Sequence, residues 1–481
     1  MNREFLINIM FLLGINLLVK PIYLFGIDRN VQNLLPEGEY GLYAQILSLT
    51  YLFQILADFG IQNYNNRQIA QHRQLLNKYF STLLSLKLML AILFAGVVFI
   101  AGYFLSYWQA NPMVLGILIL NQVLLSYLLF LRSNISGLGR YRWDSLLSIL
   151  DKLVMILLLG SILWLGIGRS SFRLEWFVLA QTLSFTISIL IALVLLRGHL
   201  HGFKWQLKWP ILIVIFRQTY PYALVVLLMT LYTRIDMIMI GQMLENGNQQ
   251  ADHYAAAYRL LDAVNMFGYL FASLLLPMFA RQLKLKATVH DLVRMGIQFI
   301  WAGAIPLALL SVAFAPEIMQ ALYPGKAADP QILVWLMLSF LAISGSYIYG
   351  TLLTANGDLM VMNRIFIVGI VANISLNYFL IPIHQAEGAA IATLVTQSLV
   401  FLAQVGLAKR QLHLRFDPVL IGKLALFALV CYLSTNYFYL FLSNWNWYYI
   451  LGFLLLLQLL FALLIRLLDW KMVWGLMVNR E

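Results

Sequence analysis

The stretch LLVKPIYLFGIDRNVQNLLPEGEYGLY, residues 17–43, decides how this chain folds. An apolar run carries Lys20 and Pro21 within it and ends in Asp28 and Arg29. A second apolar run opens at Glu39, after only a short polar connection. Runs of this length predict two membrane-spanning helices joined by a tight turn, with a buried cation and a proline-induced kink in the first.

A related arrangement returns later in the chain. There LYTRIDMIMIGQML carries Arg234 and Asp236, and ADHYAAAYRLL opens the following apolar run. The spacing between matching positions is nearly constant at 214, 213 and 214 residues for the pairs Lys20 and Arg234, Glu39 and Asp252, and Arg67 and Arg281. The repeat predicts two similar lobes, each placing a cation near the axis between them.

The composition identifies the class of protein. Of the 481 residues, 62% are hydrophobic and only 11% are charged, more apolar surface than a soluble chain can hide. The single cysteine, Cys431, excludes a disulfide framework within the chain. The N-terminal apolar run exceeds a signal-peptide core and lacks a small-residue cleavage site before Lys20, so we interpret it as an uncleaved first span.

A span needs about 20 apolar residues, and backbone groups in lipid must be satisfied within the segment, so every span is expected to be a helix. The sequence predicts an all-α polytopic membrane protein with about fourteen spans: 4–26, 39–60, 79–106, 112–133, 145–166, 174–196, 214–243, 253–280, 292–315, 331–354, 363–383, 387–408, 418–442 and 446–467.

The repeat divides these spans into domains. We expect an N-terminal six-helix lobe (1–196), a cytoplasmic amphipathic linker (197–213), a C-terminal six-helix lobe (214–410), and an appended helix pair with a tail (411–481). Because six is even, both lobes enter the membrane from the same side, which predicts a pseudo-twofold axis along the membrane normal. The last two spans are free of charge from Leu424 to Ile465 and are expected to face lipid.

Lysine and arginine set the orientation. Cytoplasmic N- and C-termini place 23 of the 32 basic residues inside, 4 outside and 5 within spans. This asymmetry explains the net charge of +12 through contact with anionic membrane lipids, and no nucleic-acid partner is needed.

Charges inside the membrane mark the candidate site. A charged side chain at mid-bilayer costs roughly 2.5–3.5 kcal/mol, so such cations are expected to face a partner or a water-filled cavity. The candidate substrate-binding cations are Lys20, Arg29, Arg234 and Arg259. Their alternatives are snorkelling or an ion pair for Lys20, a solvated loop charge for Arg29, and an ion pair with Asp262 for Arg259.

Acids within spans are fewer. Asp58, Asp236 and Asp262 are candidates for proton or sodium coupling, or for charge balance. A structural role is expected for the remaining span charges, Lys87, Asp151 and Lys152, with Asp151 pairing to Lys87. The tyrosines that recur at the two equivalent helix starts are expected to anchor in the membrane interface, with stacking on sugar rings as the alternative: Tyr40, Tyr43, Tyr254 and Tyr258.

Enzymatic motifs are absent from the sequence. There is no G-x-S-x-G, no Walker A, no D-x-D and no cysteine–histidine metal spacing, and the loops are too short for a soluble catalytic domain. The expectation is a protein that is not an enzyme and carries no cofactor. The candidate cavity has an excess of cations, which favours an anionic substrate over a cationic drug.

Several segments, in their order and spacing, resemble the polysaccharide-transporter branch of the multidrug/oligosaccharidyl-lipid/polysaccharide exporter superfamily. They are KPIY at 20–23, PEGEYGLY at 36–43, ADFG at 57–60, RIDMIMIG at 234–241, YAAAYRLL at 254–261, TLLTANGD at 351–358 and EGAAIAT at 387–393. The resemblance implies a flippase that moves polyprenyl-diphosphate-linked oligosaccharides, such as O-antigen or capsule repeat units, across the bacterial inner membrane.

The same resemblance implies cationic residues in a central cavity, at positions matched here by Lys20, Arg29, Arg234 and Arg259. It also implies alternating access and work alongside a glycan polymerase. Three alternatives stay open: a peptidoglycan-precursor flippase, a multidrug exporter of the same superfamily, and a membrane glycosyltransferase or polymerase.

Overall fold

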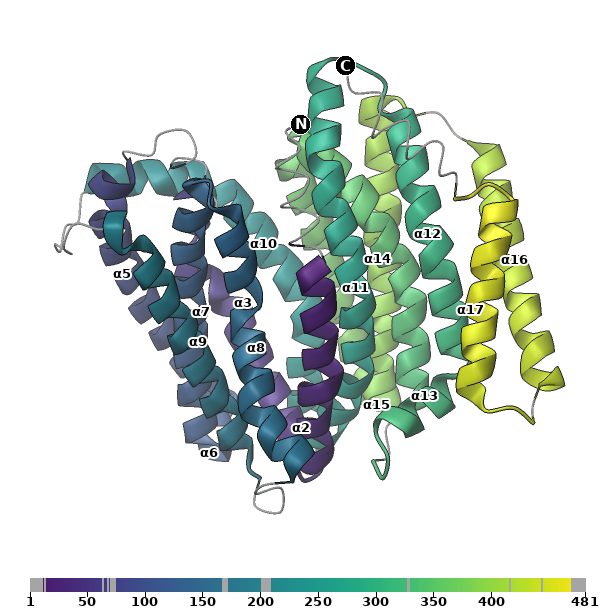
Figure 1. The fold of residues 1–481 in the computed structure, drawn as a ribbon, viewed down its shortest axis with the longest axis horizontal. Helices are drawn as coiled ribbons and strands as arrows, with labels where there is room; N and C mark the ends of the chain where they lie inside the picture. Colours follow the sequence, from purple (N-terminus) through teal and green to yellow (C-terminus); the bar gives the residue numbers. More distant parts are fainter. Residues whose placement is uncertain are drawn as a thin grey trace. The chain divides into compact units, whose positions relative to one another are not determined.

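The computed structural model describes residues 12, 14–62, 65–66, 69, 75–166, 172–199, 209–326, 329–414, 417–442 and 444–468. Over these ranges every regular element is a helix (Figure 1). Twelve of the described helices are long and apolar enough to cross a membrane. One of them, α15, contains two of the predicted spans, and a continuous helix over residues 14–34 covers the described part of the first. The predicted all-α architecture with about fourteen spans is confirmed.

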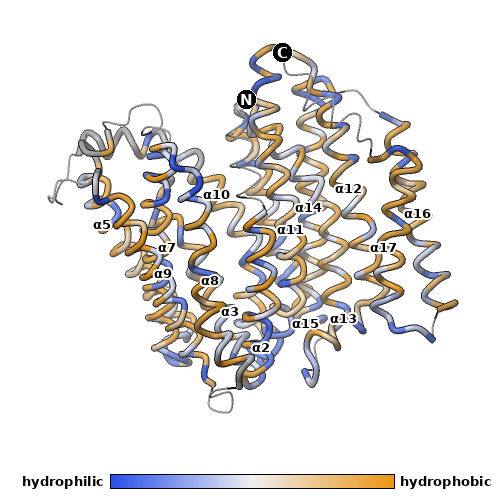
Figure 2. The backbone as a smooth tube through the Cα atoms, in the orientation of Figure 1, coloured by the Kyte–Doolittle hydropathy of each residue, from blue (hydrophilic) through white to orange (hydrophobic). Residues whose placement is uncertain are grey.

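Hydropathy follows the helices in the way that a membrane requires. Hydrophobic residues run along most of each long helix, and hydrophilic stretches lie chiefly near helix ends (Figure 2). Many large apolar side chains are also exposed on the surface, among them Leu157 at 74% and Phe104 at 79%. Such an exposed apolar surface suits contact with lipid rather than with water.

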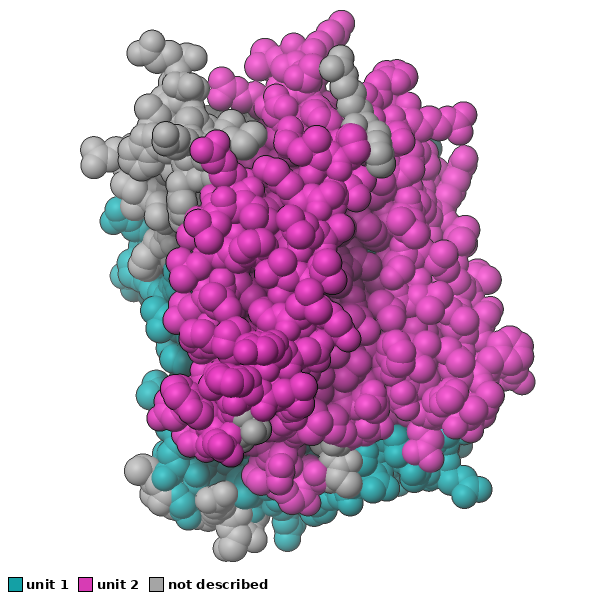
Figure 3. All heavy atoms as spheres, turned by 90° about the vertical axis from the view of Figure 1, so that its right-hand side faces the viewer, with its two compact units in different colours: residues 1–255 teal, residues 256–481 magenta. Residues whose placement is uncertain are grey.

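Internal contacts divide the chain into two compact units, residues 1–255 and 256–481, coloured separately in Figure 3. The division falls inside α11 (Gly247–Lys284), after Ala255. The predicted lobe boundaries at 196, 213 and 410 stay predictions, as does the pseudo-twofold axis. Most of the predicted linker 197–213 and the tail from residue 469 lie outside the described residues.

Unit 1 begins with the first helix, including a π-helical segment, and continues with a series of long helices and two short helical turns. Their bounds are η1 (Ile22–Asp28), α2 (Arg29–Leu34), α3 (Glu39–Asp58), α5 (Leu75–Phe104), α6 (Tyr107–Ala110), α7 (Pro112–Gly137), α8 (Tyr141–Leu165), α9 (Leu174–Leu196), η3 (Arg197–His199) and α10 (Trp209–Met243).

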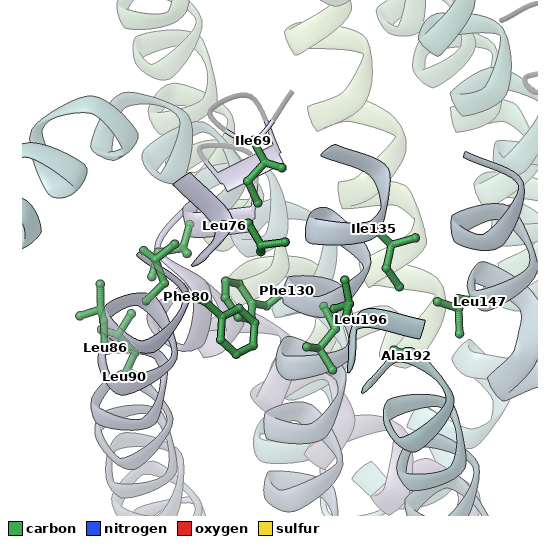
Figure 4. Close-up of a cluster of buried hydrophobic side chains, with 13 residues drawn as sticks. Ile69, Leu76, Phe80, Leu86, Leu90, Phe130, Ile135, Leu147, Ala192 and Leu196 are labelled. Atoms are coloured by element: carbon green, nitrogen blue, oxygen red, sulfur yellow. The ribbon is translucent and has the colours of Figure 1, made fainter. Parts of the chain in front are cut away.

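A cluster of buried apolar side chains holds α5, α7, α8 and α9 together at one end of unit 1 (Figure 4). Phe80 of α5 stacks on Phe130 of α7 with ring centres 5.7 Å apart. Leu147 of α8 and Leu196 of α9 lie in the same cluster, each about 2% exposed or less. This core fixes the helices that carry the buried charges described below.

The first helix is distorted where the sequence predicted a kink. Pro21 has no N–H to donate to the preceding turn, and the seven residues that follow it, Ile22–Asp28, form a π-helix. A π-helix is rare and is frequently found at functional sites. The segment leads directly into α2, and a short turn then connects α2 to α3, which begins at Glu39.

Unit 2 contains the larger part of α11 and six further helices. Their bounds are α12 (His290–Ala313), α13 (Ala315–Leu322), α14 (Pro330–Asn356), α15 (Leu359–Leu412), α16 (Pro418–Phe441) and α17 (Trp447–Leu464).

The element α15 is a hairpin of two helices. Its backbone breaks at Gln385, where φ is 53° and ψ is −134°. A Cβ on Gly388 would lie 2.4 Å from the carbonyl oxygen of Leu380, and one on Gly369 would lie 2.9 Å from Val400. These close approaches show the two halves packed antiparallel, which confirms the separate spans predicted at 363–383 and 387–408.

The last two helices form a second hairpin in unit 2. Gln458 of α17 donates hydrogen bonds to the carbonyl oxygen of Cys431 at 3.2 Å and to the hydroxyl of Thr435 at 3.0 Å, both on α16. The outer positions are apolar and exposed, with Leu440 at 75% and Leu464 at 79%. The pair packs on α12, consistent with the appended hairpin that the sequence predicts.

Candidate functional site

Two lysines lie near the π-helical segment of unit 1. The Nζ of Lys152, on α8, lies 3.0 Å from Oδ2 of Asp151 and 4.6 Å from the centre of the Tyr23 ring. Lys20 lies close enough for the charges of Lys152 and Asp151 to act on it. Asp151 pairs with Lys152, and Lys20 adds a second positive charge near this pair.

A third cation extends this group. The guanidinium carbon of Arg234, on α10, lies 5.3 Å from the centre of the Tyr51 ring on α3. Tyr51 also lies near Lys152. Cation–π contacts of this kind contribute roughly 0.5–2 kcal/mol and help to hold the cation in place. We call Lys20, Lys152 and Arg234 the cation cluster.

The sequence singled out two members of the cation cluster and missed the third. Lys20 and Arg234 were found through the repeat, whereas Lys152 was expected to be structural. The adjacent Asp151 suggested a satisfied charge, but the sequence does not show that Lys20 lies near the same pair. Tyr51, which links the cluster, carries no signal of its own in an apolar helix.

A tyrosine-to-aspartate hydrogen bond occurs twice in unit 1. The hydroxyl of Tyr40 donates to Asp28 at 3.0 Å, and that of Tyr254 donates to Asp236 at 3.0 Å. Tyr40 is 5% exposed and Tyr254 is 1% exposed, and Tyr43 at 3% accepts a hydrogen bond from Gln181. The expected interface anchoring of these three tyrosines is therefore wrong, and so is the alternative of sugar stacking. A buried ring can contact neither the membrane interface nor a sugar.

A buried clasp joins the end of the first helix to the start of α11 within unit 1. Gln32 donates to Oδ1 of Asp252 at 2.5 Å, and the backbone N–H of Gly38 donates to Oδ2 at 3.1 Å. Gln32 and Asp252 are at most 1% exposed. A Cβ on Gly41 would lie 1.9 Å from the carbonyl oxygen of Asn248, so glycine permits the close helix approach.

A separate ion pair lies between α3 and α5. The Nζ of Lys87 lies 2.7 Å from Oδ1 of Asp58 and also donates to the hydroxyl of Ser126 at 2.7 Å. The expected pairing of Lys87 with Asp151 is therefore wrong, because α3 presents Asp58 to α5 while Asp151 pairs with its own neighbour, Lys152. The contact supports charge balance as the role of Asp58.

Asp58→Asn is expected to destabilise the protein by about 3–5 kcal/mol, because it leaves Lys87, only 1% exposed, as a buried cation without a carboxylate. The midpoint of thermal unfolding of the purified protein measures this loss. Asp144→Asn is the matched control: it breaks the Arg132–Asp144 pair, whose side chains are each 20% exposed, and is expected to cost no more than about 1 kcal/mol. Equal shifts in the two variants would contradict the structural role of the Asp58–Lys87 pair.

Three further predicted residues are not members of the cation cluster as defined above: Arg29, Arg259 and Asp262. Arg29 begins α2, half-buried, and its Nε has no hydrogen-bond partner among the described residues. Arg259 belongs to unit 2, where it is 4% exposed and donates a short hydrogen bond to the hydroxyl of Tyr323. Asp262 lies one turn further along α11 and is half-buried. Among the described residues, no group of three or more His, Cys, Asp or Glu is arranged to hold a metal.

Comparison with solved structures shows the fold. The structure titled lipid II flippase MurJ, inward closed conformation, has a TM-score of 0.65 and 15% identity, covering 95% of this chain and 98% of that one. An inward-facing multidrug resistance MATE family transporter of the MOP superfamily has a TM-score of 0.58 and 13% identity, covering 81% and 94%. A MOP superfamily transporter from Pyrococcus furiosus Vc1 has a TM-score of 0.55 and 14% identity, covering 84% and 94%.

The sequence itself also matches a family model. No curated protein gives a significant match to the chain. The model described as polysaccharide biosynthesis protein matches residues 5–283, which include the first helix, the π-helical segment and the whole cation cluster. On this match, the chain belongs to the polysaccharide biosynthesis protein family.

Proposed function

We propose that this protein is a flippase that carries a polyprenyl-diphosphate-linked oligosaccharide from the cytoplasmic to the outer leaflet of the bacterial inner membrane. The observation that carries the proposal is the cation cluster, in which Lys20 lies near the Lys152–Asp151 pair and Arg234 lies against Tyr51. The cluster holds three cations, and a diphosphate brings two negative charges that such a group attracts. The substrate leaves the site covalently unchanged, and the lobes alternate access to the two faces.

The chemistry of the cluster supports an anionic headgroup. Arginine and lysine donors form charge-assisted hydrogen bonds to phosphate oxygens, and these bonds are shorter and stronger than neutral ones. Arginine adds a planar fork that matches two phosphate oxygens at once. Partly buried cations on helices are also pre-organised, since little reorganisation is needed when the anion arrives. The family match supports a glycan as the rest of the substrate.

A cationic drug is a poorer fit to the same residues. Asp28 and Asp236 are buried and hydrogen-bonded to tyrosines, and Asp58 is paired with Lys87. A multidrug exporter of cations would need carboxylates that face its cavity without such partners. A peptidoglycan precursor also carries a diphosphate, so the cation cluster suits it equally, and the substrate's glycan distinguishes the two flippases. We favour an O-antigen, capsule or exopolysaccharide unit because of the family match.

The cycle needs a driving force, for which we propose two sources. Asp58, Asp236 and Asp262 remain candidates for proton or sodium coupling. Asp58 is the weakest candidate because its carboxylate already forms an ion pair with Lys87. Consumption of the product by a polymerase on the outer face would drive the same movement without an ion. Neither source requires a cofactor.

The test is deletion of the gene, followed by mass spectrometry of the lipid-linked intermediates that accumulate. The proposal predicts a diphosphate-linked oligosaccharide of complete repeat-unit length on the cytoplasmic face, and its mass identifies the glycan. Accumulation of incomplete units would support a glycosyltransferase instead. An unchanged set of lipid-linked species, together with a gain in drug sensitivity, would support the exporter.

A further inference from the structure

A cavity of about 210 Å³ lies in unit 1 between α3, α7 and α10. It is smaller than the roughly 300–1,000 Å³ of pockets that hold drug-sized ligands. Val226, one of its lining residues, is 49% exposed. Polar side chains from all three helices line it: Tyr51, Gln54, Asp58, Ser126 and Thr230. Apolar side chains such as Leu52 and Leu227 complete the lining, so the cavity suits one small ligand that has both polar and apolar surface.

The charges around the cavity favour a neutral ligand. Among the described residues, Asp58 is the only charged side chain that lines it, and Lys87 lies 2.7 Å from Oδ1 of that carboxylate. The pair has no net charge, so the cavity attracts neither an anion nor a cation strongly. A carboxylate nevertheless has about four acceptor positions, and Lys87 and a long 3.3 Å bond from the backbone of Gln62 leave some of them open. Hydroxyl donors can fill these positions.

Two further lining groups are available to such a ligand. In the part of the chain that the structure describes, the amide of Gln54 and the hydroxyl of Tyr51 make no hydrogen bond to another residue. The hydroxyl of Thr230 donates to the carbonyl of Val226 at 2.8 Å and keeps its acceptor capacity. An amide, a phenol and a carboxylate together offer both donors and acceptors, which is the pattern that a polyhydroxyl ring requires.

The position of the cavity relates it to the cation cluster. Tyr51 lines the cavity, and its ring also lies 5.3 Å from the guanidinium carbon of Arg234. In a diphosphate-linked glycan the first sugar is bonded directly to the phosphate, so its binding site must adjoin that of the diphosphate. We propose that this cavity binds the first, uncharged sugar residue of the lipid-linked substrate. The inference rests on the proposed function and adds a determinant of substrate specificity to it.

The test compares three probes on the full-length protein in lipid nanodiscs. One is a polyprenyl diphosphate without sugar, and the other two are the same lipid carrying a single uncharged hexose or a single N-acetylhexosamine. The wild-type protein is expected to bind the tighter of the two sugar-bearing probes about tenfold more tightly than the bare diphosphate, the gain from two or three hydrogen bonds. Gln54→Leu and Thr230→Val are expected to reduce that gain to about threefold or less and to leave binding of the bare diphosphate unchanged.

Thr186→Val is the matched control. Thr186, on α9, makes the same bond to the carbonyl four residues earlier, at 2.8 Å, but does not line the cavity. It is expected to keep the full gain. Equal affinity of the wild type for all probes, or a full gain in both cavity variants, would overturn the sugar site while leaving the diphosphate site intact. If the proposed function itself is wrong, the outcome is different: none of the three probes binds the wild-type protein.

Discussion

Gly41→Ala is expected to prevent stable folding. The new Cβ would lie 1.9 Å from the carbonyl oxygen of Asn248 and 2.7 Å from the backbone nitrogen of Asp252. Both are backbone atoms of α11, so no side-chain rotation relieves the clash, and α3 must move away from the buried clasp at Asp252. Over-packed cores lose about 1–3 kcal/mol when side chains can adjust. We expect a loss beyond the upper end of that range, measured as the thermal unfolding midpoint or as the absence of monodisperse protein after purification.

Gly96→Ala is the control for this prediction. Gly96 lies within α5, and a Cβ there would meet nothing within 4 Å. Alanine is the better helix former by about 1 kcal/mol, so this variant is expected to unfold at the same temperature as the wild type or slightly higher. A Gly41→Ala protein as stable as Gly96→Ala would show that α3 and α11 do not approach as closely as described.

Arg234→Gln and Lys152→Gln are each expected to weaken binding of a polyprenyl diphosphate by about 10–100-fold. The reason is the loss of a charge-assisted contact worth roughly 1.5–3 kcal/mol to the diphosphate. Titration of the bare lipid diphosphate into nanodisc-embedded protein measures the change. The sequence assigned no binding role to Lys152. Weaker binding by Lys152→Gln would therefore support a site built from three cations, rather than one built only from the repeated positions Lys20 and Arg234.

The control for charge alone is Arg364→Gln. Arg364 is an exposed residue of α15 in unit 2, and its replacement removes the same net charge from the protein. It is expected to leave diphosphate affinity within about twofold of the wild type, since exposed charges are screened by salt. An equal loss in Arg364→Gln and Arg234→Gln would mean that the lipid responds to the overall charge of the protein and not to the cation cluster.

The positions of the helices could be predicted because the membrane restricts the choices. An apolar run of sufficient length must be helical in lipid, so the ranges around Pro112–Gly137 and Leu174–Leu196 followed from the sequence directly. The turn at Gln385 was also placed correctly, between runs that are each long enough to span. Pro21 correctly marked the distorted helix, although the π-helix itself carries no sequence signature known to us.

The partners of buried charges could not be predicted, because they depend on how each helix is rotated about its axis. The sequence has several acids within spans, among them Asp58 and Asp151, and only the packing of α3 against α5 selects Asp58 as the partner of Lys87. The prediction of interface anchoring for the tyrosines was wrong for a related reason. Tyrosine near a helix start is typical of the membrane interface, and the repeated hydrogen bonds of Tyr40 and Tyr254 emerge only once Asp28 and Asp236 are placed beside them.

The central claim is that this protein moves a lipid-linked glycan across a membrane without altering it, and reconstitution tests it most directly. Purified protein is placed in liposomes whose inner leaflet holds the diphosphate-linked glycan that accumulates in the deletion strain, and an impermeant lectin detects glycan outside. We predict lectin binding that increases with time in wild-type liposomes, falls at least about tenfold with Arg234→Gln, and involves a glycan of unchanged mass. No protein-dependent appearance of glycan outside, or a glycan of altered mass, would contradict the account.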